Sequence, residues 1–203
     1  MLKKFAPVFL LIAIAATLSF AATSEVVKFP AKDVQGTGPL PYNYRIIDGH
    51  IHAGGHPLNP ATEFGNSDEQ ALSILNYLKS KGVENIIDLE NTRSIQDRYQ
   101  ALLDKAGMTR IHIPLNGIVL PTRDQWASIK RLMKGPVYIH CKWGADRTGM
   151  AIARYLVEEK GYTSDEAYKA VLTGGSHAGA MGGFKKNLAN IYLRYFIYHG
   201  PMK

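Results

Sequence analysis

The sequence predicts an α/β fold: a single domain with a small, largely parallel central sheet that is flanked by helices. The composition is that of a foldable globular protein, since 46% of its 203 residues are hydrophobic and 20% are charged. From Tyr44 onward, short apolar runs typical of strands alternate with segments of helical periodicity. Strands that alternate with helices at this spacing favour parallel pairing, because each helix carries the chain back to the starting end of the sheet.

Local signals give the boundaries of the expected elements. Ser67 is a typical N-cap for a helix that stops at Gly82, and Thr163 and Glu166 form a capping box that opens another helix. The expected strands lie around 45–53, 83–89, 109–113 and 137–140. The expected helices cover about 68–81, 95–106, 122–133, 149–159, 164–172 and 184–198, with a Gly-rich mobile loop at 174–183. Apolar residues at helical spacing in the last helix indicate core packing, namely Phe184, Leu188, Ile191, Tyr192, Tyr195 and Phe196.

The first residues have the composition of an export signal. Lys3 and Lys4 precede an almost wholly apolar stretch, and Ser19-Phe20-Ala21 supplies the small residues that a signal peptidase requires. The alternative is an uncleaved membrane anchor, which these small residues disfavour. We therefore expect an exported protein, periplasmic or secreted, with no stable membrane anchor after cleavage. The expected organisation is a signal peptide at 1–21, an extended N-terminal arm at 22–44 and one domain at 45–203.

Cysteine content and charge exclude several classes of protein. Cys141 is the single cysteine, which excludes an internal disulfide framework, a Cys-rich zinc site and an iron–sulfur cluster. The formal net charge of +7 favours anionic partners such as phosphate esters. Nucleic acid is not expected, because the basic residues are scattered and no aromatic stacking platform accompanies them.

One loop combines the features of an anion site. Cys141 follows the expected strand that ends at His140. The next expected helix begins at residue 149, so a short loop separates the two elements. The backbone N–H groups of Lys142–Thr148 would converge on one point, where the helix dipole adds positive potential. The same donors stabilise a thiolate, so Cys141 is expected to be a nucleophile.

Three other residues suit the same loop. Arg147 lies far enough after Cys141 for the loop to curl a full turn, so its planar fork can grip two phosphate oxygens. Gly144 permits a positive φ or a close backbone approach, and Thr148 can donate a hydroxyl hydrogen bond to the sulfur. The expected phosphate-binding residues are Lys142, Trp143, Gly144, Ala145, Asp146, Arg147 and Thr148.

The loop resembles the signature of a known family. His140-Cys141, five intervening residues and Arg147-Thr148-Gly149 are similar to the signature loop of the cysteine-dependent phosphatases, in particular bacterial members of the dual-specificity-like group. The resemblance extends more weakly over residues 45–199, including Ala53-Gly54-Gly55-His56-Pro57. Rhodanese-like sulfurtransferases also use a Cys-led loop, but theirs is one residue shorter and fits this spacing poorly.

The resemblance implies dephosphorylation in two steps. Cys141 would attack phosphorus, Arg147 would clamp the phosphate, and water would hydrolyse the cysteinyl-phosphate, with a protein acid serving the leaving group. His140 would support the loop backbone. The family's usual upstream acid has no counterpart, since residues 110–121 contain no carboxylate and only Asn116 lies near the expected place. Asp146 matches the position proposed for the acid in myotubularin-type phosphatases; the alternatives are Asp124, Asp88 or no protein acid.

Several functional alternatives stay open at this point. Lys142 is similar to a basic residue in phosphoinositide phosphatases, which favours inositol polyphosphates or lipid headgroups as second-choice substrates. A non-catalytic phosphate-binding module is the other alternative, because the upstream acid is missing. His50, His52 and His56 suggest a metal site of the amidohydrolase kind, although such enzymes need a larger barrel.

The leading expectation is a metal-free protein tyrosine or dual-specificity phosphatase. It would need no cofactor, act on a phosphorylated protein or a small phosphate ester, and work as a monomer.

Overall fold

The computed structural model describes residues 40–59, 65–173 and 188–202. The expected signal segment, most of the expected arm and the Gly-rich loop at 174–183 lie outside these residues. Within them, no helix is long and apolar enough to cross a membrane.

The described residues contain one five-stranded sheet in the order β1-β2-β5-β3-β4. Neighbouring strands are parallel except for β1, which pairs antiparallel with β2 at the edge. The strands are β1 (Arg45–Ile47), β2 (Ile51–Gly55), β3 (Asn85–Asp88), β4 (Thr109–His112) and β5 (Val137–Cys141). This confirms the predicted α/β domain with a largely parallel sheet, and it places β5 at the centre, between β2 and β3.

The single strand expected at 45–53 is wrong, because the chain reverses there. Ile47 pairs with Ile51, and Asp48 and Gly49 between them adopt positive φ angles of 54° and 72°. Asp-Gly is a strong hairpin signal, since both residues tolerate the left-handed conformation that a tight reversal needs. The reversal creates β1 and β2 from one apolar run.

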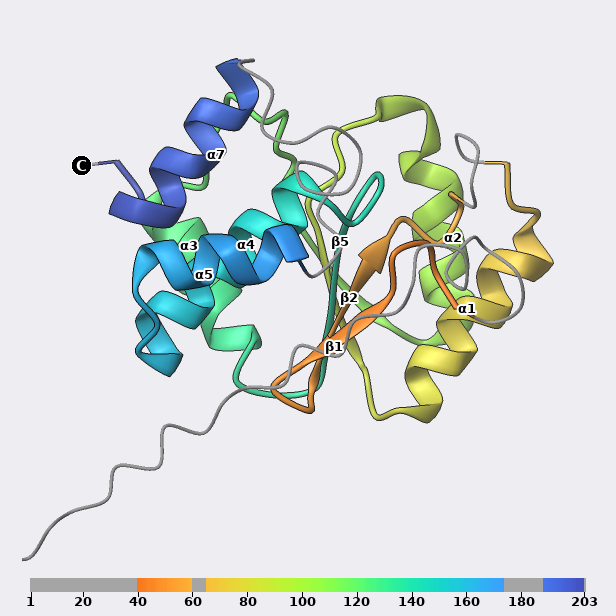
Figure 1. The fold of residues 1–203 in the computed structure, drawn as a ribbon. Coiled ribbons are helices and arrows are strands. Elements are labelled where there is room, and N and C mark those ends of the chain that lie inside the picture. The colour runs from red at the N-terminus through yellow and green to blue at the C-terminus, as the bar shows by residue number, and fades with distance from the viewer. Residues whose placement is uncertain (1–39, 60–64, 174–187, 203) are drawn as a thin grey trace, which may run out of the picture.

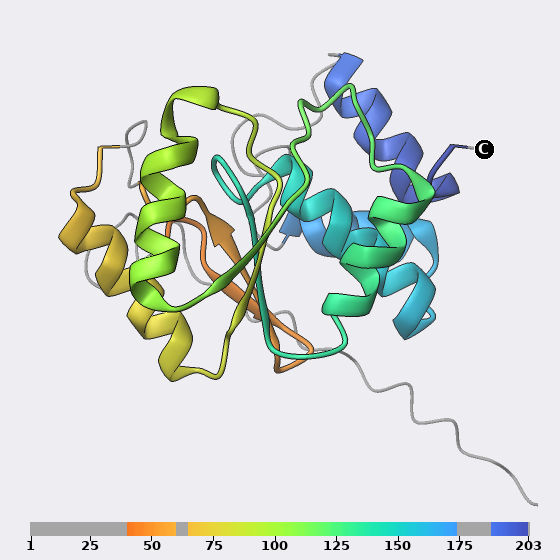
Figure 2. The same ribbon diagram turned by 180° about the vertical axis from the view of Figure 1, so that it is seen from behind.

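Helices cover both faces of the sheet (Figures 1 and 2). One layer holds α1 (Asp68–Ser80) and α2 (Gln96–Ala106), the latter preceded by a 3₁₀ turn at Arg93–Ile95. The other layer holds α3 (Arg123–Leu132), α4 (Asp146–Lys160), α5 (Ser164–Thr173) and α7 (Leu188–His199). Capping boxes open α1 at Ser67 and α3 at Thr122, and Thr163 and Glu166 exchange the bonds of a third before α5.

Two apolar cores result, one on each face of the sheet. The core under α3, α4, α5 and α7 includes Ile51, Trp126, Ile139, Leu156 and Phe196. The core under α1 and α2 includes Leu75, Leu78, Ile86, Leu103 and Tyr138. Alternate residues of β5 therefore face opposite layers, with Ile139 and Cys141 towards α4 and with Tyr138 towards α1 and α2.

Two helix predictions need correction. Helix α4 begins at Asp146 rather than at residue 149, so Asp146 and Arg147 belong to its first turn. In α7, Phe196 is buried as expected, but Ile191, Tyr192 and Tyr195 are exposed and the inward face is completed by Leu193 and Ile197. The prediction counted the rings of Tyr192 and Tyr195 as apolar, and this placed the buried side of the helix on its exposed face.

The turn between β1 and β2 is tied to the far end of α4. Asp48 accepts hydrogen bonds from the Tyr155 hydroxyl at 2.9 Å and from Lys160 Nζ at 2.9 Å. Burial raises the pKa of Asp48, but the hydrogen bonds from Lys160 and Tyr155 outweigh that effect and leave the pKa below its usual value. The edge hairpin is therefore bound to the same helix that follows the central strand.

Candidate active site

The loop after the central strand lies at the carboxyl edge of the sheet. Strand β5 ends at Cys141, four residues follow, and α4 begins at Asp146. The N–H groups at the start of a helix have no acceptors within the helix, so they and the helix dipole favour an anion there. Cys141 is buried, with 3% of its surface exposed, and faces the α4 layer. The strand, loop and helix order predicted for the anion cradle is confirmed.

Gly144 lies against the end of β2. Its φ is 67°, and a Cβ atom added to it would overlap the backbone of Gly54 and Gly55. A residue with a side chain is excluded on both grounds, because positive φ is strained and no space exists for the added atom. The predicted need for glycine at this position is confirmed, and Gly54 and Gly55 form the platform on which the loop rests.

Side-chain amides hold the loop carbonyls from outside. Asn59 Nδ2 donates to the Lys142 carbonyl at 2.7 Å, the His56 N–H donates to the same oxygen at 3.1 Å, and Asn43 Nδ2 donates to the Gly144 carbonyl at 3.2 Å. In a trans peptide the carbonyl and the next N–H point in opposite directions. The N–H groups of Trp143 and Ala145 are thereby turned away from these anchors, towards the concave side of the loop.

Arg147 is held along one edge of its guanidinium. Nη2 donates to Glu90 Oε2 at 2.8 Å, and Nη1 donates to the carbonyls of Leu89 and Leu115 at 3.0 and 2.7 Å. Nη1 also lies 3.3 Å from Asn91 Oδ1. These acceptors come from the segments after β3 and β4, so the fold fixes the direction of the side chain.

The electrostatics of Arg147 link it to the cysteine. Burial lowers the pKa of Arg147, but the nearby Cys141 and Glu90 outweigh that effect and raise the pKa above its usual value. Burial likewise raises the pKa of Glu90, but Arg147 and hydrogen bonds from Thr92 outweigh it and hold the carboxyl ionised. Glu90 therefore anchors the guanidinium and is poorly suited to donate a proton.

The acid candidates occupy different places. Asp146 is half-buried in the first turn of α4, beside Arg147 in the sequence. Asp124 is exposed in the first turn of α3, and Asp88 is fully buried in the opposite layer, paired with Arg110. Asn116 accepts bonds from the N–H groups that follow it, which is a turn-forming role. Of the three carboxylates, only Asp146 belongs to the loop and the helix turn that surround Cys141.

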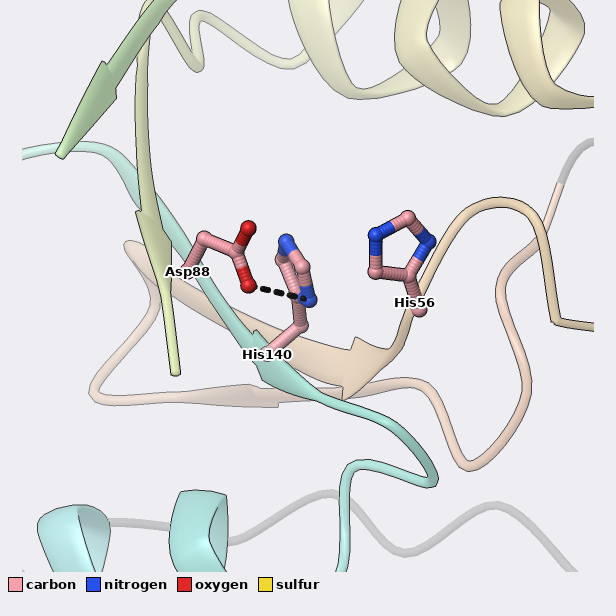
Figure 3. A group of neighbouring side chains, drawn as sticks. All are labelled: His56, Asp88 and His140. Carbon is pink, nitrogen blue, oxygen red and sulfur yellow. Dashed lines mark ion pairs between the residues drawn. The ribbon is translucent and has the colours of Figure 1, made fainter. Parts of the chain in front are cut away.

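His140 belongs to a buried polar cluster behind the loop (Figure 3). Its Nε2 lies 3.0 Å from the Tyr99 hydroxyl, and its Nδ1 lies 3.6 Å from Asp88 Oδ1 and 3.4 Å from the Cys141 carbonyl. Burial lowers the pKa of His140, and Asp88 only partly offsets this. The ring is neutral at pH 7 and, as the sequence suggests, positions the backbone at Cys141.

The same cluster brings three potential metal-ligating side chains together, but their present partners argue against a metal centre. Ligand atoms of His56, Asp88 and His140 lie within 4.8 Å of one another. Asp88, however, is paired with Arg110 and accepts the Glu90 N–H at 2.8 Å, so a cation would have to displace these donors. We interpret the cluster as a hydrogen-bond network.

The metal grouping of His50, His52 and His56 that the sequence suggested does not form. His50 bonds the Met133 carbonyl, and His52 bonds the Tyr44 hydroxyl.

Thr148 behaves differently from the expectation, and Trp143 packs at the side of the loop. Thr148 is fully buried, and its Oγ1 has no hydrogen-bond partner among the described residues, so the expected bond to the sulfur is not present in this arrangement. Trp143 is half-buried and packs edge-on against Tyr42, with ring centroids 5.4 Å apart. Lys142 and Ala145 lie in the loop as predicted, the lysine half-exposed and the alanine buried.

A cavity of about 340 Å³ lies beside Asn91, which contacts Arg147. Its lining residues are Asn91, Arg93, Gln96, His112 and Pro114. Through Asn91 the cavity lies next to Arg147, and Arg93 and His112 also line it.

Comparisons with known proteins agree with this geometry. The family model described as "Polymorphic toxin system, DSP-PTPase phosphatase" matches residues 63–161. The matched description indicates the cysteine-dependent phosphatase superfamily. This agrees with the resemblance of the His140–Gly149 loop, and the match supports phosphatase activity. No curated protein matches the chain significantly.

Solved structures show the same fold at low identity. P. aeruginosa TpbA gives a TM-score of 0.55 at 15% identity, covering 85% of this chain and 91% of that one. A structure of TpbA in complex with pTyr gives 0.53 at 14%, covering 87% and 97%. The core catalytic domain of the PP-IP phosphatase SIW14 from S. cerevisiae gives 0.51 at 15%, covering 77% and 84%.

The sequence did not single out the residues that contact the loop from distant parts of the chain. Glu90, Asn43 and Asn59 contact it only because the fold brings the ends of three segments together. An Asn or Glu after a strand is common, so no local signal marks these three. Gly54-Gly55 did carry a signal, since two glycines at the end of a strand indicate close backbone approach.

Gly144→Ala tests the packing of the loop. We expect kcat/KM for an aryl phosphate to fall by about 100-fold or more, because the loop must move by the width of an atom to admit the methyl group. Gly161→Ala is the matched control: it also has a positive φ at an end of α4, but no atom lies within 4 Å of its added Cβ. The control should lose about 1 kcal/mol of stability and no activity. Full activity of Gly144→Ala would contradict the role assigned to the contact.

Proposed function

We propose that the protein hydrolyses phosphomonoesters through a cysteinyl-phosphate on Cys141. The observation that carries the proposal is the loop itself, which starts at a buried cysteine, turns its carbonyls outward and ends at an arginine fixed by Glu90. In the first step the thiolate sulfur attacks phosphorus, the S–P bond forms and the P–O bond to the leaving group breaks. Arg147 and the loop N–H groups stabilise the charge on the phosphoryl oxygens.

Asp146 is our candidate for the general acid and base. Its carboxyl group would protonate the leaving oxygen as the P–O bond breaks. The resulting carboxylate would then take a proton from the water that attacks the cysteinyl-phosphate, which releases inorganic phosphate and restores the thiolate. The position of Asp146 in the first turn of α4 supports this role, and Asp124 is the alternative on a neighbouring element.

Phosphotyrosine, or a mixed set of phosphorylated proteins, is the proposed substrate class. Support comes from the fold shared with TpbA, which has been seen in complex with pTyr. Inositol polyphosphates are the second candidate, because the cavity beside Arg147 carries Arg93 and His112, which suit a substrate with further phosphates. SIW14, with the same fold, is described as a PP-IP phosphatase. Phosphate release from phosphopeptides and from inositol phosphates, measured side by side, separates the two.

Cys141→Ser is expected to abolish steady release of phosphate from an aryl phosphate, because a serine hydroxyl is not ionised at neutral pH. EDTA should leave the wild-type rate unchanged. Phosphate binding without turnover in the wild-type protein would instead favour the non-catalytic module. Loss of activity with EDTA would contradict a metal-free reaction on Cys141.

Asp146→Asn tests the acid through leaving-group chemistry. Hydrolysis of an alkyl phosphate should slow by about 100-fold or more, because an alkoxide is a poor leaving group without a proton. An aryl phosphate with an acidic phenol should slow far less. Asp124→Asn, at the start of α3, is the control and should slow neither. Equal slowing of both substrates by Asp146→Asn would argue against the assignment.

We also propose that residues 1–21 direct export and are then removed. The basic head, the apolar stretch and the small residues at 19–21 support this. N-terminal sequencing of protein recovered from a bacterial periplasm should begin at Ala22, and an intact Met1 in that fraction would contradict cleavage.

A further inference from the structure

Arg45 is a charged residue inside the sheet region, close to the active-site loop. It begins β1, and only 3% of its surface is exposed. Among the residues that the structure describes, no carboxylate pairs with it, and its one hydrogen bond runs from Nη1 to the Asn43 carbonyl at 2.9 Å. A buried charge without a partner is costly, so a compensating anion is expected nearby.

Strand register places Arg45 on the same face as Cys141. Arg45 pairs with Ala53 of β2, and Ala53 pairs with Ile139 of β5, two residues before Cys141. Paired residues of neighbouring strands point to the same face, and Ala53, Ile139 and Cys141 all face the α4 layer. The side chain of Arg45 therefore lies on the side of the sheet that carries the sulfur.

The residues of β2 between Arg45 and the loop have small side chains or none. Two strand spacings separate β1 from β5, or roughly 10 Å, which an arginine can largely span if nothing bulky stands between. The intervening positions are Ala53 and Gly55. The bond to Asn43 shows that the side chain runs back towards the end of the sheet where Asn43 holds Gly144.

Charge coupling agrees with this placement. Burial lowers the pKa of Arg45 to about 10, while Cys141 and Tyr138 act in the opposite direction. A pKa near 10 leaves the guanidinium protonated at neutral pH. After burial, Cys141 is the largest influence on the pKa of Arg45.

The charged groups around Cys141 come from several elements, and Arg45 is a buried cation among them with no carboxylate paired to it in the described residues. From α4 and its loop come Asp146, Arg147 and Lys142; Arg147 is neutralised by Glu90 from the segment after β3. From β5 itself come Tyr138 and His140, whose rings face the opposite layer, where Asp88 is paired with Arg110. On β2 the residues beside the sulfur, Ala53 to Gly55, carry no charge.

We propose that Arg45 is a positioning residue that supplies a buried counter-charge to the Cys141 thiolate from beneath the loop. The inference rests on the proposed function to the extent that Cys141 is the nucleophile. Arg45 does not touch the leaving group; it acts through the sulfur, and its charge rather than its hydrogen bond to Asn43 is the active feature.

Alkylation of the single cysteine by iodoacetamide, followed across pH in the full chain, tests this without any substrate. Arg45→Gln keeps a donor for the Asn43 carbonyl but removes the charge, whereas Arg45→Lys keeps both. We expect the pH midpoint of alkylation to rise by about one unit in Arg45→Gln, so that alkylation below the midpoint is roughly tenfold slower. Arg45→Lys should restore most of the wild-type profile.

Arg154→Gln is the matched control. Its guanidinium also has little exposure and bonds a carbonyl, that of Ile197, but it is paired with Glu158 further along α4. Its profile should equal that of the wild type. An unshifted midpoint in Arg45→Gln, or equal shifts in Arg45→Gln and Arg45→Lys, would overturn the proposal. Thermal unfolding of each variant confirms that folded protein is being compared.

The readouts separate this inference from the proposed function. A shifted alkylation profile in a protein that releases no phosphate supports the counter-charge and rejects the phosphatase reaction. Turnover with an unshifted profile does the reverse.

Discussion

The contact between Gly144 and the end of β2 is the constraint on which the site depends. The loop after β5 must fold back onto the neighbouring strand, and it can do so only because neither Gly144 nor Gly54-Gly55 has a side chain at the meeting point. With the backbone seated there, Asn43, Asn59 and the His56 N–H reach the loop carbonyls. The direction of the N–H groups that would face a phosphate follows from those outward bonds.

The charged groups near the loop favour an anion, because the fold pairs the nearby carboxylates Glu90 and Asp88 with arginines. Glu90 forms an ion pair with Arg147, so the two charges neutralise each other. Asp88 forms an ion pair with Arg110 in the opposite layer. The buried cation Arg45 and the start of α4 both lie on the side of the sulfur. A site with this balance favours an anion, whether the thiolate alone or a phosphate ester.

The sequence predicted the parts of this protein that depend on local chemistry. The N-cap at Ser67, the capping box at Thr163 and the spacing of Cys141, Gly144 and Arg147 each depend on a few neighbouring residues, and the sequence predicted them. The reversal at Asp48-Gly49 was missed although its signal is local, because the apolar run on both sides looked like one strand. Arg45 and Glu90 could not be found in this way, since their roles arise from strand register and from the meeting of distant chain segments. The exposed face of α7 shows that tyrosine spacing alone does not tell which side of a helix is buried.

The bonds from Tyr155 and Lys160 to Asp48 have a bearing on cooperativity. They join the edge hairpin to the helix that follows the central strand, while β2 is already paired with β5 along its whole length. Hairpin, central strand and helix are thereby closed into a ring of contacts, so local opening of one requires opening of the others. Such a unit exchanges its amide hydrogens as one block. The strands and the helix that carry the Cys141 loop therefore open together with the domain.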